Sequence, residues 1–319
     1  MRLYVLHENP DWYAPLAAAF DQAGLAHEQW LLGEAVIDLG DPPPAGVYWS
    51  RMSASSHTRG HPFAKDQTRG VLAWLEAHGR RVVNGRRVLD LEMSKVEQLA
   101  ALSAAGFDVP RTLAIAGTGE LAAAARKLPV PFIGKHNQGG KGLGVRKFDS
   151  HAEFDAYLAD PGYEPPVDGI TLLQEYLVAA KPQITRVEIV GGEFVYAITA
   201  DTGRGGFQLC PADACAVPAP GLPAGPPAGQ PATVPVAEPS LFALRAGFSD
   251  PVIGRYIEFA ARHEIGIAGF EFIETADGRL VTYDINTTTN YNAEIEAAAP
   301  RPALPAVAAY LGGLLQGRS

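Results

Sequence analysis

The strongest constraint on this chain is the pair Asp277-Gly278, which lies between two runs of alternating apolar and polar residues. Asp-Gly in this setting is typical of a two-residue type I′ turn, so the sequence predicts an antiparallel hairpin over residues 267–286. In the register that such a turn sets, Glu271 faces Asp284, with their Cβ atoms about 4.5–5.5 Å apart. Because side chains alternate between the two faces of a strand, Asn286 is expected on the same face as both carboxylates.

Two carboxylates this close repel each other, so the hairpin predicts a cation between them. Oxygen ligands from Glu271, Asp284 and Asn286 suit Mg²⁺ or Mn²⁺, which bind through few carboxylates and complete their shell with water and substrate phosphates. A solvated acidic hairpin is the alternative. The aromatic residues expected on the opposite face favour the metal site, because they indicate that the hairpin covers a core: Phe270, Phe272 and Tyr283.

A second pattern is an apolar strand over residues 131–135, which ends in Lys135 and leads into the glycine-rich stretch 139–144. Glycines allow backbone amides to approach a phosphate closely, so the pattern favours a phosphate-binding loop. No Gly-Lys-Ser/Thr follows at the spacing of a P-loop, and a flexible surface hairpin is the alternative. Residues 117–119 imitate a dinucleotide fingerprint, but no acidic residue follows at the required distance.

Two further segments depend on context for their interpretation. Residues 172–177 form a strand that ends in Gln174-Glu175 and continues into Tyr176-Leu177, which would suit a hinge beside an adenine ring. Gly191-Gly192 predicts a second hairpin over residues 183–199, and Arg186 lies on its first strand. An arginine there is either an ordinary surface residue or part of a neighbouring active site.

The composition limits the class of protein. Lys and Arg total 26 against 35 Asp and Glu, for a net charge of −9 over 319 residues, which disfavours a nucleic-acid partner. No stretch approaches the ~18 uninterrupted apolar residues of a membrane span, and the N-terminus turns polar too early for a signal peptide. The expectation is a cytoplasmic protein without a membrane partner, and its oligomeric state stays open.

The order of the expected elements divides the chain into three units. Residues 1–92 are predicted to form an α/β subdomain with a parallel sheet, residues 93–175 a central α+β subdomain, and residues 176–319 a C-terminal subdomain. Residues 211–240, dense in Pro, Ala and Gly, are expected to be a mobile excursion from the last unit. The expected helices cover residues 12–23, 67–78, 94–105, 120–127, 151–159, 250–263 and 303–315.

Taken in order, these patterns resemble the ATP-grasp superfamily, and their spacing is most similar to the amino-acid ligases that add glutamate to ribosomal protein or to small carrier molecules. The resemblance covers about residues 83–292, with a weaker match over the N-terminal unit. It implies an ATP-grasp fold, α/β and α+β in class, with the N-terminal parallel-sheet unit as a pre-ATP-grasp subdomain. ATP is then expected between the two later subdomains.

The resemblance also implies roles for individual residues. Lys95 and Lys135 would lie on the phosphates, and the glycine loop would close over them through Gly139, Gly140, Lys141 and Gly142. The adenine would meet Gln174, Glu175, Tyr176 and Leu177, and the metal would be held by Glu271, Asp284 and Asn286. Arg186, Asn286 and Lys135 are the expected catalytic residues, and Arg51 and Asn84 are candidates for binding the substrate.

The sequence departs from the family pattern in four places. Glu271 stands where aspartate is common, and Asp284 stands where glutamate is usual, a swap that preserves the combined reach of the pair. Residues 178–181 lack the acidic residue that often holds the ribose. Residues 287–292 replace a serine-proline-glycine stretch, and the Pro-rich excursion replaces an Arg-rich one. The last two changes concern the acceptor side, so the family's substrate does not carry over.

The function that these residues favour is ATP-dependent carboxylate–amine ligation through an acylphosphate, with ATP and Mg²⁺ as cofactors and an amino acid among the substrates. The partners expected are a small carboxylate and a small amine, and a peptide or protein acceptor stays open. Two other functions remain. One is a nucleotide-binding regulatory module that has lost turnover, and the other is a phosphotransferase on the same scaffold.

Overall fold

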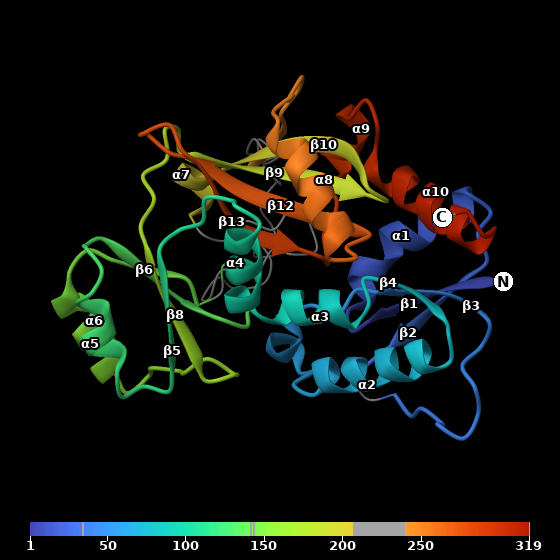
Figure 1. Cartoon of the computed structure of the whole chain (residues 1–319), viewed down its shortest axis with the longest axis horizontal. Coiled ribbons are helices and arrows are strands. Elements are labelled where there is room, and N and C mark those ends of the chain that lie inside the picture. Colours follow the sequence, from blue (N-terminus) through green and yellow to red (C-terminus); the bar gives the residue numbers. More distant parts are fainter. Residues whose placement is uncertain (34, 141, 143, 207–239, 319) are drawn as a thin grey trace, which may run out of the picture.

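The computed structural model describes residues 1–33, 35–140, 142, 144–206 and 240–318. Over these residues the strands form three sheets, which Figure 1 shows as three lobes around a common centre. Most of the expected excursion, residues 211–239, lies outside the described residues, as do Cys210 and Cys215. Among the described residues, none of the helices combines the length and apolar character needed to cross a membrane.

The first sheet is parallel and has the strand order β2-β1-β3-β4. Its strands are β1 (Arg2–His7), β2 (His27–Leu31), β3 (Gly46–Ser50) and β4 (Arg81–Val83). Helices α1 (Pro10–Gln22) and α2 (Ala64–Ala77) follow β1 and β3 and pack against this sheet, and the 3-10 helix η1 (Ser56–Arg59) precedes α2. Parallel pairing follows from this alternation of strand and helix, because each helix returns the chain to the end of the sheet at which the preceding strand began.

The second sheet is antiparallel in the order β5-β8-β6-β7. Its elements are β5 (Thr112–Ala116), α5 (Leu121–Ala125), β6 (Phe132–His136), β7 (Arg146–Phe148), α6 (His151–Ala159) and β8 (Ile170–Glu175). Phe132, Phe148 and Phe154 are fully buried between this sheet and its two helices. These aromatic contacts fix the sheet that carries Lys135 and the segment after β8.

The third sheet has the order β11-β10-β9-β12-β13 and carries the hairpin with the two carboxylates. Its strands are β9 (Gln183–Val190), β10 (Glu193–Asp201), β11 (Phe242–Leu244), β12 (Ile267–Glu274) and β13 (Leu280–Asn286). Helices α3 (Arg86–Met93), α4 (Lys95–Ala104) and α8 (Val252–Arg262) bury Phe270 and Phe272 against one face. The opposite face carries Glu271 and, nearer the C-terminal helix, the buried Val190 and Ile267.

The C-terminal helix α10 (Ala303–Leu315) joins the first and third sheets in one core. Val307 and Leu311 are completely buried and share a cluster with Leu3 of β1 and Val190 of β9. In Figure 1, α10 lies beside α1 at the edge where these two sheets meet. The short helices α7 (Thr202–Gly205) and α9 (Ala293–Ala298) complete the described elements.

All seven expected helices are present, with ends that move by up to a few residues, but α3, α7, α9, β2 and β11 were not expected. Most of these are too short to show a clear hydrophobic period. Ser94 caps α4 by accepting a hydrogen bond from the Glu97 backbone. Although the sequence places α4 in the central unit, the helix packs against β13 of the third sheet.

Candidate active site

The hairpin β12–β13 pairs Glu271 with Asp284 and Gly269 with Asn286, as expected from the sequence. The turn itself differs from the expected one. Glu274 pairs with Leu280, and the Thr275 backbone donates a hydrogen bond of 2.9 Å to the Arg279 carbonyl, so residues 276–278 form a loop of three residues instead of two. The expected register survives because β13 carries one extra residue beyond that point, a bulge at Tyr283.

The bulge also changes the direction of the Tyr283 side chain. The expectation that Tyr283 lies with Phe270 and Phe272 on the core face is wrong. Its hydroxyl donates a hydrogen bond of 2.7 Å to Oε2 of Glu271 on the carboxylate face. The extra residue shifts the alternation of faces by one position, so Tyr283 and Asp284 both reach the same cavity.

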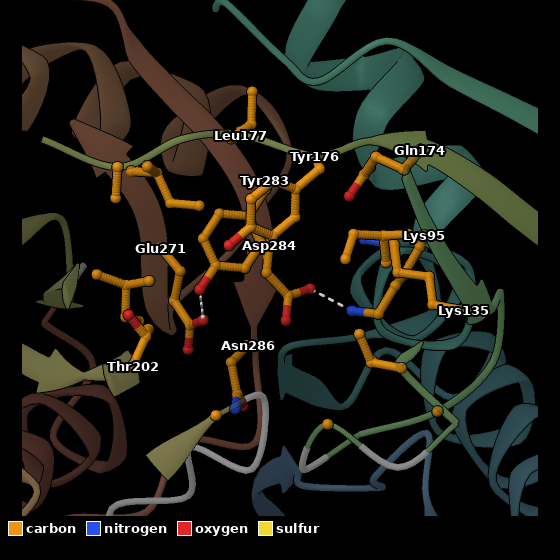
Figure 2. Close-up of a pocket in the computed structure, with 18 of the residues that line it drawn as sticks. Lys95, Lys135, Gln174, Tyr176, Leu177, Thr202, Glu271, Tyr283, Asp284 and Asn286 are labelled. Carbon is orange, nitrogen blue, oxygen red and sulfur yellow. Dashed lines mark hydrogen bonds and ion pairs between the residues drawn. The ribbon is translucent and has the colours of Figure 1, made fainter. Parts of the chain in front are cut away.

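This cavity has a volume of about 510 Å³ and lies between the second and third sheets. Figure 2 shows Glu271, Asp284 and Asn286 on one side of it, with Lys95 and Lys135 facing them. The elements that supply these side chains are far apart in sequence: β12 and β13, the first turn of α4, and β6. The cavity therefore brings together all the expected metal-binding residues and both expected phosphate-binding lysines that precede the glycine loop.

The two lysines lie in different electrostatic environments in this cavity. Lys95 forms an ion pair with Asp284, and although burial alone would lower the pKa of Lys95, the neighbouring carboxylates raise it overall. Lys135 is 6% exposed and has no such partner among the described residues. Burial and the nearby charge of Lys95 lower the pKa of Lys135 to about 7, so it is poised to gain a proton when an anion arrives.

Glu271 is 8% exposed and is surrounded by charge. Burial and the adjacent Asp284 carboxylate raise the pKa of Glu271. Arg186 of β9 lies directly opposite it in the register of β9 and β12, with Nη1 3.5 Å from Oε1 of Glu271. A divalent cation between Glu271 and Asp284 would relieve the repulsion that burial makes costly.

The donor set fits a hard divalent cation, because Glu271, Asp284 and Asn286 offer only oxygen ligands on one side of the cavity. The described residues contain no group of three or more His, Cys, Asp or Glu side chains that could hold a metal ion. A cation here would therefore have two carboxylates and an amide from the protein and would take its remaining ligands from phosphate or water.

The expected nucleotide-binding residues line the same cavity wherever the structure describes them. Gly139, Gly140 and Gly142 form one wall, while Lys141 lies outside the described residues. Residues 174–177 form another wall, and Figure 2 labels Gln174, Tyr176 and Leu177 of it. The Glu175 carboxylate accepts a hydrogen bond of 2.9 Å from the backbone of Arg111, which ties this segment to the start of β5.

The two substrate candidates lie elsewhere. Arg51 is 2% exposed, does not line the cavity, and donates hydrogen bonds to the Thr289 carbonyl and the Asn290 side chain at 2.7 and 3.0 Å. Asn84 uses its side-chain amide on the backbone of Ile267, Thr287 and Gly266. The structure thus places both residues as links between the first and third sheets.

Several residues of the cavity were not expected from the sequence. Glu92 lines it from the end of α3 and accepts hydrogen bonds from the backbone and hydroxyl of Thr287. Thr202 and Gly203 of α7 also line it, and the Thr202 backbone donates a hydrogen bond of 2.9 Å to the carbonyl of Pro182, which follows the segment 178–181 where the ribose-binding acid is missing. Both helices were absent from the prediction. For Glu92, its position three residues before Lys95 was a usable signal.

The three-sheet arrangement is the ATP-grasp fold, which confirms the expected fold class. The chain is similar over 97% of its length to 99% of a RimK-domain ATP-grasp protein from Sphaerobacter thermophilus, with 16% identity and a TM-score of 0.67. It is similar over 98% of its length to 99% of the D-cycloserine synthetase DcsG, with 16% identity and a TM-score of 0.65.

A third similar structure is the macrocyclase MdnC from Microcystis aeruginosa, bound to its precursor peptide MdnA. The likeness covers 98% of this chain and all of the other, with 11% identity and a TM-score of 0.62. The sequence matches no protein-family model and no curated protein. At these identities the likeness establishes the fold.

Proposed function

We propose that this protein is an ATP-dependent ligase that joins a carboxylate to an amine through an acylphosphate and forms ADP. The observation that carries the proposal is the cavity in which Glu271 and Asp284 face Lys95 and Lys135. Paired carboxylates opposite two lysines are suited to hold a metal–triphosphate complex and to neutralise charge during phosphoryl transfer.

Structures that share the fold support this reading. One is described as a D-cycloserine synthetase, and another is the ATP-grasp ligase PsnB complexed with a minimal precursor, Mg and ADP. These descriptions belong to those proteins. For this chain they favour ligation over the two other functions that the sequence left open.

In the proposed reaction, a substrate carboxylate attacks the γ-phosphorus of ATP, ADP leaves, and an amine then displaces phosphate from the acylphosphate. Glu271, Asp284 and Asn286 would hold Mg²⁺, which would supply Lewis-acid withdrawal of charge from the triphosphate. Lys135 and Lys95 offset charge on the phosphates from the facing wall. Arg186, whose Nη1 lies 3.5 Å from Glu271, does not itself line the cavity; we propose that this nitrogen reaches the acylphosphate and the tetrahedral oxyanion that follows it from behind Glu271.

For the substrates we propose an amino acid as one partner, with an amine or the amino end of a peptide as the acceptor. A peptide acceptor is supported by two proteins of similar fold, PsnB and MdnC, each bound to a precursor peptide. Residues 287–292, which follow β13 and would border the acceptor, differ from the glutamate-ligase pattern. The acceptor of the glutamate ligases therefore does not carry over to this chain.

The test is an ADP-release screen of amino acids, small carboxylates and short peptides, with mass spectrometry of the products. Hydroxylamine is included because it traps an acylphosphate as a hydroxamate. Amide products with hydroxamate formation support the ligase. A phosphorylated product without hydroxamate would show a phosphotransferase, and ATP binding without ADP release across the panel would show a regulatory module.

Asp284→Ala is expected to abolish substrate-dependent ADP formation, because it removes one metal ligand and the partner of Lys95. Glu193→Gln is the matched control, since Glu193 is an exposed carboxylate of the same sheet that pairs with Arg301. Circular dichroism checks that both variants fold. Full activity in folded Asp284→Ala would contradict the metal assignment.

A further inference from the structure

Arg186 is held by residues that the proposed reaction does not use. It is 3% exposed, and its Nε donates a hydrogen bond of 2.6 Å to Oε1 of Glu188, which is 1% exposed. Its Nη2 donates to the hydroxyl of Thr289. The same hydroxyl lies 3.0 and 3.1 Å from the two Glu188 carboxylate oxygens, so Thr289 bridges the ion pair.

These contacts leave one nitrogen of the guanidinium directed elsewhere. Nη1 is the nitrogen that lies 3.5 Å from Oε1 of Glu271, whose side chain lines the cavity. Glu188 and Thr289 do not line that cavity. They engage the far side of the guanidinium, and the planar fork of arginine converts two fixed corners into a fixed direction for the third.

Gly269 provides the space for this arrangement. It lies opposite Glu188 in the register of β9 and β12, and a Cβ atom at Gly269 would overlap Nε of Arg186. Any side chain there would have to displace the guanidinium. The absence of a side chain at Gly269, on the strand that carries Glu271, therefore leaves room for the Arg186 guanidinium.

The charges support the same reading. Burial alone would lower the pKa of Arg186, but the carboxylates of Glu188 and Glu271 outweigh it and raise the pKa. A buried guanidinium without Glu188 would be left with Glu271 as its carboxylate partner and would form a bidentate pair with it. Such a pair would draw Glu271 away from Asp284 and from a metal ion.

We propose that Glu188 and Thr289 are positioning residues that hold Arg186 with Nη1 toward Glu271, at the border of the cavity, and keep Glu271 available for the cation. The proposal rests on the proposed function, because it takes Arg186 to act on the acylphosphate. Neither Glu188 nor Thr289 touches the substrate or the metal in this account. Their effect is expected on turnover and on Mg²⁺ dependence, with nucleotide affinity unchanged.

The variants are Glu188→Gln, which keeps the shape and removes the charge, and Thr289→Val, which removes the hydroxyl. Thr289→Ser keeps the hydroxyl and is expected to retain activity. Thr185→Val is the matched control: Thr185 is a buried residue of the same strand, and its hydroxyl accepts a hydrogen bond of 2.6 Å from Arg245 rather than from Arg186. Gly269→Ala tests the space in front of the guanidinium.

The kinetic expectation is a loss of about 10–100-fold in kcat for Glu188→Gln, Thr289→Val and Gly269→Ala, as for a misplaced oxyanion-binding group. The concentration of Mg²⁺ needed for half-maximal rate is expected to rise in Glu188→Gln. The Kd for ATP, measured by calorimetry, should stay within about twofold, because none of these residues lines the nucleotide cavity. Unchanged kcat and Mg²⁺ dependence in folded Glu188→Gln and Thr289→Val would overturn the proposal.

A second measurement separates this proposal from the proposed function. The Nε–H signal of Arg186, assigned by its absence in Arg186→Lys, is expected to exchange slowly with water in ¹⁵N NMR spectra of wild type, Thr289→Ser and Thr185→Val. It should exchange at least about 10-fold faster in Glu188→Gln, which weakens the acceptor of Nε–H, and in Thr289→Val, which removes the hydroxyl that holds both Glu188 and Nη2 in place. Equal exchange rates would refute the positioning role, even if the wild type released no ADP with any substrate.

Discussion

At the scale of single residues, the cavity depends on lysines and carboxylates whose charges are set by their neighbours. Lys95 forms an ion pair with Asp284, and the neighbouring carboxylates raise its pKa. The pKa of Lys135 is lowered, mainly by burial and by the charge of Lys95. Two chemically identical side chains on one cavity thus differ in pKa. The residue types could be recognised in the sequence, but this difference arises only from the packing around them.

Lys135 leads to a prediction about pH. Its pKa is about 7 in the free protein, and a bound triphosphate will raise it, since a nearby anion favours the ammonium form. ATP binding should therefore take up part of a proton near neutral pH. Affinity should be greatest below the free pKa and should fall as the pH rises above it, until the pKa of the bound state is passed.

Calorimetry in two buffers with different ionisation enthalpies measures this uptake, as the heat of binding then depends on the buffer. Lys135→Arg is the control, because a guanidinium stays protonated throughout and should remove the Lys135 contribution. Identical buffer dependence in wild type and Lys135→Arg would show that Lys135 does not titrate on binding.

At the scale of secondary structure, the hairpin that carries Glu271 and Asp284 shows two departures from expectation that cancel. The loop has one residue more than a two-residue turn, and the bulge at Tyr283 adds one residue to β13. Glu271 still meets Asp284, and Tyr283 gains a place beside Glu271. The pairing was predictable from Asp277-Gly278. The bulge was not, because the alternation of apolar and polar residues does not show where a strand contains an extra residue.

Gly278 tests this description of the loop, because its φ of +85° suits glycine. Gly278→Ala should destabilise the protein by about 1–2 kcal/mol, the cost of a left-handed conformation for a residue with a Cβ atom. Gly254→Ala is the control: Gly254 lies within α8 with open space around it, so alanine there should stabilise by up to about 1 kcal/mol. Urea denaturation measures both changes. An unfolding midpoint of Gly278→Ala equal to that of the wild type would contradict the loop geometry.

At the scale of the whole molecule, the first and third sheets are joined by α10 and by polar links. Asn84 has a φ of +53°, and its side chain bonds to the backbone of Ile267, Thr287 and Gly266. Arg51 reaches the Thr289 carbonyl in the same region. These links hold the segment that follows β13, which carries Thr289, against the N-terminal sheet.

Asn84→Ala should therefore lower the free energy of unfolding by about 2–4 kcal/mol, because it strands buried backbone groups and places alanine at a positive φ. Asn84→Gly relieves the backbone conformation but not the lost hydrogen bonds, so its destabilisation should be smaller and still clear. Thermal unfolding of the three proteins measures this order. Wild-type stability in Asn84→Gly would show that the side-chain links contribute little.

The sequence by itself determined the local elements and the facing pair Glu271 and Asp284, because turns, caps and alternation depend on neighbouring residues. It also indicated the ATP-grasp fold, through motifs whose order a fold preserves. Only the tertiary structure decided that Tyr283 faces the cavity, that Asn84 and Arg51 join two sheets, and that Glu188 and Thr289 hold Arg186. Thr289 is 103 positions from Arg186 in the chain, and contacts of that range arise from how the sheets pack rather than from any local pattern.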